Sequence, residues 1–173
     1  MRFSHQRLTL VLVVLLICVA LDQATKALAQ AYLTPRTLHL LWDTVRLQLS
    51  ENTGAFLSLG ASLSPALRFW IFIVASGAML VGVALYLVTT PELSTDVVVA
   101  LACILGGGIG NLIDRVTRQG RVVDFLNFGI GNLRTGILNV ADIFVTFGAL
   151  YVIWAAFRDG AKESSEPAEH PGE

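Results

Sequence analysis

Charged residues are scarce in this chain of 173 residues, since Asp, Glu, Lys and Arg together make up only 14% of it. Soluble globular domains carry about 25% charged residues, so the composition disfavours that class. The chain also lacks an excess of either sign, because the net charge is −1 and the Lys and Arg residues are scattered. A nucleic-acid-binding protein gathers basic residues on one face, and we therefore expect no nucleic-acid partner.

Residues that bind transition metals are equally few. The two cysteines, Cys18 and Cys103, lie in apolar stretches without CxxC or Cys/His spacing, and the three histidines, His5, His39 and His170, stand apart from them and from one another. This spacing supports neither a disulfide framework nor a zinc site. We interpret both cysteines as small apolar side chains in helices, and we expect no metal and no cofactor.

The chain instead has long apolar runs, and hydrophobic residues make up 54% of it. About 20 mostly apolar residues cross a bilayer as a helix. The predicted fold class is therefore an α-helical integral membrane protein, a single membrane-embedded domain over residues 1–158 with four transmembrane helices. These helices are expected at about residues 8–28, 69–90, 97–115 and 137–157, and the acidic tail, residues 159–173, is expected to be disordered.

The first two runs are separated by a connection too long for a plain turn. Within it, Val45, Leu47 and Leu49 alternate with polar residues at the period of a strand. We expect a small β-rich insert at about residues 36–63, lying at the membrane surface. The connection from Asp114 to Thr135, which is rich in Arg and Gly, is expected to be a loop.

The N-terminal run has two interpretations. Its basic start, its apolar core and the "ALA" at residues 27–29 resemble a cleavable signal peptide. Asp22 and Lys26, however, lie one helical turn apart on one face, which favours a helix that continues to a membrane interface.

Four spans place both termini on one side of the membrane, but charge does not identify that side. The terminal side carries Arg2, Arg7, Arg158 and Lys162, and the opposite side carries Arg36, Arg46, Arg115, Arg118, Arg121 and Arg134. Taken alone, the positive-inside rule favours termini outside the cell.

A carboxylate inside a span is costly, so Asp142 in "LNVADIFVTFG" is by default a functional candidate. Asn139 lies three residues before it on the same face. A second polar stripe in "GGGIGNLIDR" contains Gly108, Asn111 and Arg115, and a further carboxylate, Asp124, lies in "RVVDFLNF".

Each feature also has a structural interpretation. Gly106 and Gly110 form a GxxxG pair that is typical of close helix packing in membranes. Asp114 beside Arg115 is expected to form an interfacial ion pair, Asp124 alone is compatible with a solvated loop, and "ENTG" alone is a turn.

Together, two carboxylates beneath one interface can share a single proton. That is the arrangement of an aspartic protease, in which one Asp takes a proton from water and the other donates to the scissile carbonyl. Two other classes remain open from the residues alone. One is a small proton-coupled transporter or channel that relays protons through Asp124 and Asp142, and the other is a structural subunit that pairs Asp142 with an Arg of another protein.

Five blocks, "LDQATK", "ENTGAF", "GGGIGNLIDR", "VVDF" and "LNVAD", resemble the lipoprotein signal peptidases (signal peptidase II) in kind and in order. The resemblance implies a metal-free aspartyl endopeptidase of the bacterial cytoplasmic (inner) membrane, with both termini cytoplasmic and the active site near the outer face. This topology implies that the β-rich insert between the first two spans is extracytoplasmic. It contradicts the charge count taken alone, and we follow the family. The activity implied is removal of signal peptides from lipid-modified prolipoproteins, with cleavage before the diacylglyceryl-cysteine.

The resemblance also implies roles for individual residues. Asp124 and Asp142 match the catalytic pair, and Asp22 and Lys26 match a structural polar pair. The partners implied are diacylglyceryl-modified signal peptides, membrane lipid and globomycin-type inhibitors. The positions that match substrate binding and support of the catalytic pair are Asn52, Gly54, Gly108, Asn111, Arg115 and Asn139.

Overall fold

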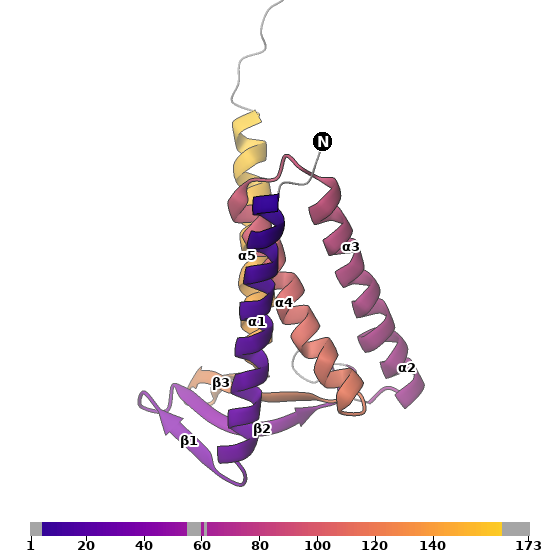
Figure 1. Ribbon diagram of the computed structural model, residues 1–173. Helices are drawn as coiled ribbons and strands as arrows, with labels where there is room; N and C mark the ends of the chain where they lie inside the picture. Colours follow the sequence, from indigo (N-terminus) through magenta and orange to yellow (C-terminus); the bar gives the residue numbers. More distant parts are fainter. Residues whose placement is uncertain (1–4, 55–59, 61, 164–173) are drawn as a thin grey trace, which may run out of the picture.

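The computed structural model describes residues 5–54, 60 and 62–163, and shows a helical bundle with a β-sheet across one end (Figure 1). In chain order the elements are α1 (His5–Tyr32), β1 (Thr37–Leu40), β2 (Val45–Asn52), α2 (Pro65–Phe69), the π-helical segment η2 (Trp70–Ala75), α3 (Ser76–Thr89), α4 (Thr95–Thr117), β3 (Val122–Ile130), β4 (Leu133–Leu138) and α5 (Val140–Glu163).

The predicted four-span fold is confirmed. Four helical stretches of the described chain are long and apolar enough to cross a membrane: His5–Tyr32, Pro65–Thr89, Thr95–Thr117 and Val140–Asp159. The second combines α2, η2 and α3, and it begins with Pro65 directly after Ser64, whose hydroxyl caps the helix by accepting from Leu67 N–H. Helix α5 continues to Glu163, so the first residues of the tail predicted as disordered are helical, and residues 164–173 lie outside the described residues.

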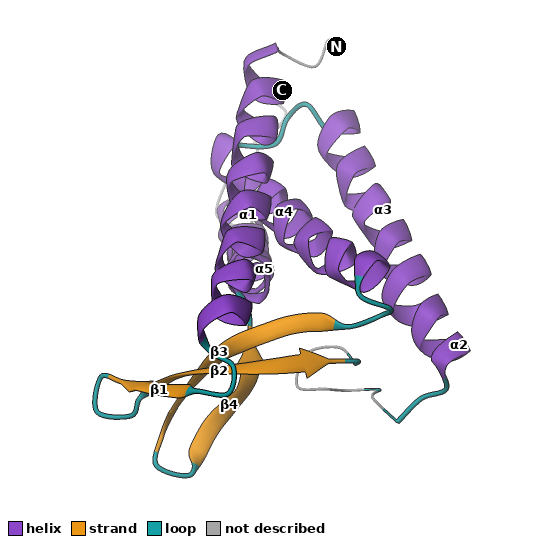
Figure 2. Cartoon of the chain, turned by 60° about the horizontal axis from the view of Figure 1, so that its bottom comes forward, coloured by secondary structure: helices purple, strands orange, loops and turns teal. Residues whose placement is uncertain are grey.

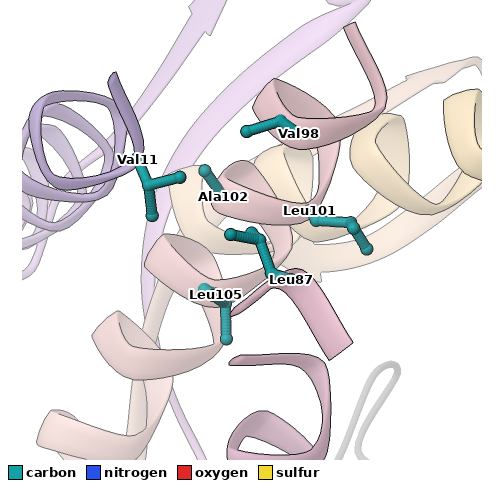
Figure 3. Packing of buried hydrophobic residues seen from close by; sticks show 6 residues of the cluster. All are labelled: Val11, Leu87, Val98, Leu101, Ala102 and Leu105. Atoms are coloured by element: carbon teal, nitrogen blue, oxygen red, sulfur yellow. The ribbon is translucent and has the colours of Figure 1, made fainter. Parts of the chain in front are cut away.

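Helix α4 is the most buried of the four spans, because α1, α3 and α5 all pack against it. Gly106 and Gly110 make the contact with α1 possible. A Cβ atom at Gly106 would lie 2.5 Å from the Cys18 Cβ, and one at Gly110 would lie 2.5 Å from the Asp22 Oδ2. The packing interpretation of the GxxxG pair is therefore confirmed. A buried apolar cluster packs α1, α3 and α4 together, and is formed by Val11, Leu87, Val98, Leu101, Ala102 and Leu105 (Figure 3).

The sheet has four antiparallel strands in the order β1-β2-β3-β4. The predicted insert between the first two spans supplies only β1 and β2, and its residues 55–59 and 61 lie outside the described residues. The prediction of a loop from Asp114 to Thr135 is wrong, because this segment contains the end of α4, all of β3 and the start of β4. Residues 122–125 are all buried. A strand covered on both faces does not alternate apolar and polar residues, so the period of two was absent.

The sheet lies across the end of the bundle opposite the first described turn of α1 and the last turn of α5 (Figures 1 and 2). Strand β3 pairs with β2 on one side and β4 on the other. Only Asn139 separates the end of β4 from the start of α5. The fold thereby brings the central strand of the sheet and the first turn of the last helix together.

Candidate active site

Asp124 lies on β3 and is only 2% exposed. Its Oδ2 accepts a hydrogen bond from Asn52 Nδ2 at 2.9 Å, and its Oδ1 accepts one from Asn139 Nδ2 at 2.7 Å. Burial raises the pKa of the Asp124 carboxyl to about 6, and the charge of Asp142 acts in the same direction. The two amide donors oppose this shift because they stabilise the ionised form.

Asp142 lies in the first turn of α5, and Asn139 directly precedes that helix. Asn139 Oδ1 accepts from the Asp142 N–H at 3.0 Å, and Asp142 Oδ2 accepts from the Asn139 N–H at 3.0 Å. This reciprocal pattern is that of a capping box. The partial positive charge of the helix N-terminus also favours a carboxylate here. Asn139 therefore contacts both candidate catalytic carboxylates, that of Asp124 through its side-chain amide and that of Asp142 through its backbone N–H.

Asn111 of α4 holds Asp142 from the other side, with Nδ2 donating to Asp142 Oδ1 at 2.9 Å. Asn111 Oδ1 accepts from Lys26 Nζ and from Asn139 Nδ2, each at 3.0 Å. An ammonium group has only donors, so the amide atom that faces Lys26 must be the oxygen. Lys26 thereby fixes which end of the Asn111 amide points at Asp142.

Lys26 is fully buried and its ammonium group has two carboxylate partners, Asp22 Oδ2 at 2.8 Å and Asp114 Oδ2 at 2.9 Å. The predicted Asp22–Lys26 pair is therefore present. Asp22 Oδ1 also accepts from the Ala141 N–H at 3.0 Å, which ties α1 to the first turn of α5.

The prediction of an Asp114–Arg115 interfacial pair is wrong. Asp114 is fully buried, pairs with Lys26, and accepts from the Val123 N–H at 3.1 Å, one residue before Asp124. Its position three residues after Asn111 put both on one helical face, and this spacing was the signal that sequence reasoning missed. Adjacent residues on a helix point in different directions, which separates Asp114 from Arg115.

Arg115 connects α4 to the turn after β2. Its guanidinium donates to the Gly54 carbonyl at 3.2 Å and to the Asn111 carbonyl at 3.5 Å, and it lies 5.7 Å from the ring centroid of Phe72. The Gly54 N–H in turn donates to Asn52 Oδ1 at 2.9 Å. Arg115 also lines a cavity of about 370 Å³ between α4 and the start of the second span.

Gly108 is the one predicted site residue that lies away from this network. A Cβ atom at Gly108 would meet the side chain of Leu80 on α3. The remaining predicted residues meet at the junction of α1, α4, β2, β3 and α5, and are Asp22, Lys26, Asn52, Gly54, Asn111, Arg115, Asp124, Asn139 and Asp142. Two carboxylates bridged by one residue, Asn139, at such a junction can share a proton and activate water.

Comparison with known proteins identifies the family of this chain. The profile of the family described as signal peptidase (SPase) II matches residues 14–158. A lipoprotein signal peptidase of Sphingopyxis alaskensis is 38% identical over 152 residues, which cover 86% of this chain and 86% of that protein. One of Brevibacillus brevis is 33% identical over 147 residues, which cover 84% of this chain and 93% of that protein.

The fold is also similar to that of a solved bacterial membrane enzyme, with a TM-score of 0.76 and 23% sequence identity over 92% of this chain and 94% of that chain. At this identity the likeness concerns the fold alone. The family match covers most of the chain and includes both candidate catalytic residues. The chain therefore belongs to the signal peptidase II family, a family of membrane proteases.

Proposed function

We propose that this protein is a membrane-embedded aspartyl endopeptidase that removes the signal peptide from lipid-modified prolipoproteins and cleaves before the diacylglyceryl-cysteine. The observation that carries the proposal is the bridge from Asn139 to both Asp124 and Asp142. The relatives named lipoprotein signal peptidase support the substrate class.

In this mechanism the two carboxylates hold one proton between them. The ionised carboxylate takes a proton from water as the water oxygen attacks the scissile carbonyl carbon, and the protonated carboxyl donates its proton to the carbonyl oxygen. The tetrahedral intermediate then collapses. The carboxyl that took the water proton gives it to the leaving nitrogen as the C–N bond breaks, and a hydroxyl of the intermediate returns a proton to the other carboxylate, so the pair again holds one proton. Because the two groups titrate as a unit, activity requires a pH at which the pair holds one proton.

The surrounding residues position the pair and the substrate. Asn52, Asn111 and Asn139 direct amide donors at the two carboxylates. Arg115 and the turn at Gly54 present donors and a carbonyl beside the pair, where an extended peptide can bind. Globomycin-type inhibitors of the family are expected to compete for the same site.

The family and the four spans identify a bacterial membrane protein, and the proposal adds its orientation. Both termini face the cytoplasm, and the sheet with the two Asp residues lies at the outer face. The Arg residues at that end have a use there, since guanidinium groups bind lipid phosphates and carbonyl oxygens.

The test is cleavage of a lipid-modified prolipoprotein in detergent by the wild type, Asp124→Asn and Asp142→Asn. Each variant is expected to lose activity by about 10² to 10⁴-fold, because each lacks one proton-transfer group. Asp96→Asn is the matched control, since Asp96 lies at the other end of α4 and bonds to Tyr151 and Arg158.

Near-normal turnover by Asp124→Asn or by Asp142→Asn would overturn the assignment of these two residues as the catalytic pair. Loss of wild-type activity in EDTA would instead indicate a metal mechanism. Proton flux in liposomes without any peptide substrate, combined with no cleavage, would support the transporter alternative.

A further inference from the structure

Two hairpin turns at one end of the sheet expose large apolar side chains. The β1–β2 turn presents Trp42, which is 98% exposed, and Leu41, which is 66% exposed. The β3–β4 hairpin presents Leu133, 85% exposed, and Ile130, 79% exposed. We call these four residues the hairpin-tip surface. Exposed apolar patches of this kind mark contact with a membrane or with a partner.

The backbone of the first turn holds its apolar side chains outward. Leu41, Trp42 and Asp43 have φ angles of 49°, 52° and 68°, in the left-handed region. Large apolar residues rarely adopt this conformation, so its persistence has to be supported by local contacts. Thr44 supplies two of them, since its N–H and its hydroxyl both donate to the Leu41 carbonyl, at 3.1 and 2.7 Å.

Asp43 supplies further contacts and joins the two hairpins. Its carboxylate accepts from Arg46 at 2.7 and 2.5 Å and contacts His39 at 2.6 Å. These partners, Arg46 first, hold the pKa of the Asp43 carboxyl well below its usual range. Arg134 of β4 donates to the Asp43 carbonyl at 2.8 Å, and the Gly129 N–H donates to the Thr44 carbonyl at 2.9 Å. The two turns are therefore fixed to each other as one surface.

The charges behind the hairpin-tip surface are unequal. Arg46 and Arg134 both lie beside Asp43, so two guanidinium groups face a single carboxylate. The result is an apolar tip backed by an excess of positive charge. That combination complements the interface of a bilayer, where apolar acyl chains meet anionic phosphates.

The position of the sheet also indicates that the hairpin-tip surface contacts the bilayer interface. The sheet lies across the end of the membrane-spanning bundle, and the β1–β2 hairpin extends sideways beyond α1 (Figures 1 and 2). A hairpin that projects past the helices at the level where they end overlies lipid. Tryptophan is enriched at this depth, because its ring is apolar and its N–H is polar.

We infer that the hairpin-tip surface inserts into the headgroup region of the leaflet at this end of the bundle. The inference depends on the membrane-spanning fold and is independent of the proposed protease activity. Such an anchor fixes the depth of β2 and β3, which carry Asn52 and Asp124.

The test uses the fluorescence of Trp42 in the full chain. The chain has three tryptophans, so Trp70→Phe with Trp154→Phe leaves Trp42 alone. Trp70 and Trp154 point out of their helices, being 62% and 53% exposed, so their removal spares the packed core. The protein is reconstituted in vesicles of phosphatidylcholine and phosphatidylglycerol, with acyl chains brominated either near the headgroup or near the bilayer centre.

The expected result is emission shifted to shorter wavelength than that of N-acetyltryptophanamide, with stronger quenching by shallow bromines than by deep ones and little quenching by aqueous iodide. A variant that retains only Trp154, in α5, is the positive control for lipid quenching. Adding Leu133→Asp to the Trp42-only chain is expected to shift the emission toward longer wavelength, because the charge withdraws the joined turns from lipid.

Quenching by iodide alone would overturn the inference, since Trp42 would then lie in water. Stronger quenching by deep bromines would also overturn it, because the tip would lie in hydrocarbon. If neither agent quenches and the emission depends on the protein-to-lipid ratio, a second copy covers the surface and lipid does not. An unchanged spectrum after Leu133→Asp would refute the single joined surface.

Discussion

Asn139 is the residue on which the geometry of the site depends most. Its amide nitrogen donates to Asp124, its amide oxygen caps the N–H of Asp142, and its own N–H donates to the Asp142 carboxylate. A single side chain thereby relates a residue of the sheet to a residue of the last helix. Any change in the angle between β4 and α5 changes the relation of the two carboxylates.

The raised pKa of Asp124 predicts a dependence of stability on pH. The folded-state pKa of about 6 exceeds the reference value of 3.8, so the folded protein binds more protons than the unfolded chain between these two values. Stability is therefore highest below the lower value and falls as the pH rises through the higher one. By linkage, the free energy of unfolding decreases by about 2–3 kcal/mol over this pH range.

Thermal unfolding in detergent from about pH 4 to pH 7 checks this dependence. Asp124→Asn removes the titrating group, so the stability of the wild type relative to this variant should decline across the range. Asp96→Asn should keep the decline of the wild type. If the stabilities of the wild type and Asp124→Asn changed with pH in parallel, this result would contradict the raised pKa of Asp124.

Lys26 gives a second prediction at this scale. Lys26→Met keeps the length of the side chain but leaves Asp22 buried without its cation and Asp114 with Arg118 alone, whose Nε lies 3.3 Å from Asp114 Oδ1. Breaking a buried pair by removing one partner costs about 3–5 kcal/mol. Arg121→Met is the matched control, because Arg121 pairs with Glu51 at the surface, where an ion pair contributes less than about 1 kcal/mol. Equal unfolding temperatures of the two variants would refute the prediction.

At the scale of the elements, α4 is the centre of the bundle because its glycines let neighbouring backbones approach. Gly107 lies against the Ala141 carbonyl of α5, and Gly106 lies against Cys18 of α1. The same helix carries Asn111 and Asp114 to the site. Close packing of α4 therefore also determines how near α1 and α5 come to each other at the site.

Gly106→Ala is expected to destabilise the protein by about 1–3 kcal/mol, since overpacking forces the surrounding structure to shift. Gly82→Ala provides the contrast, because a Cβ atom there meets nothing within 4 Å. In a helix that change is neutral or stabilising by up to about 1 kcal/mol. Chemical or thermal unfolding in detergent measures both, and a Gly106→Ala variant as stable as Gly82→Ala would contradict the packing role.

At the scale of the whole molecule, the sheet and the site lie at one end of the bundle, and the α3–α4 connection lies at the other (Figure 1). The proposed orientation therefore predicts opposite accessibility for these two ends. With Cys18 and Cys103 replaced by Ala, Asn132→Cys in the β3–β4 turn should react with an impermeant thiol reagent in intact cells. Glu92→Cys in the α3–α4 connection should react only after permeabilisation, and the reverse pattern would overturn the orientation.

The sequence by itself determined the four spans and the candidate residues. Apolar length requires a helix in lipid, where every backbone polar group must be bonded internally, and a carboxylate such as Asp142 stands out there because of its cost. The spacing of Asp22 and Lys26 likewise indicated their pair.

The tertiary structure alone decided what depends on residues far apart in the chain. The first four residues of strand β3 are all buried, and the strand pairs with β2, which is distant in sequence, so its local pattern did not reveal it. Asp114 pairs with Lys26 across two helices rather than with its neighbour Arg115. Gly108 turned out to face α3. The physical reason is common to all three, since local sequence fixes periodicity and burial preference, whereas the partner of a buried group is chosen by which elements pack together.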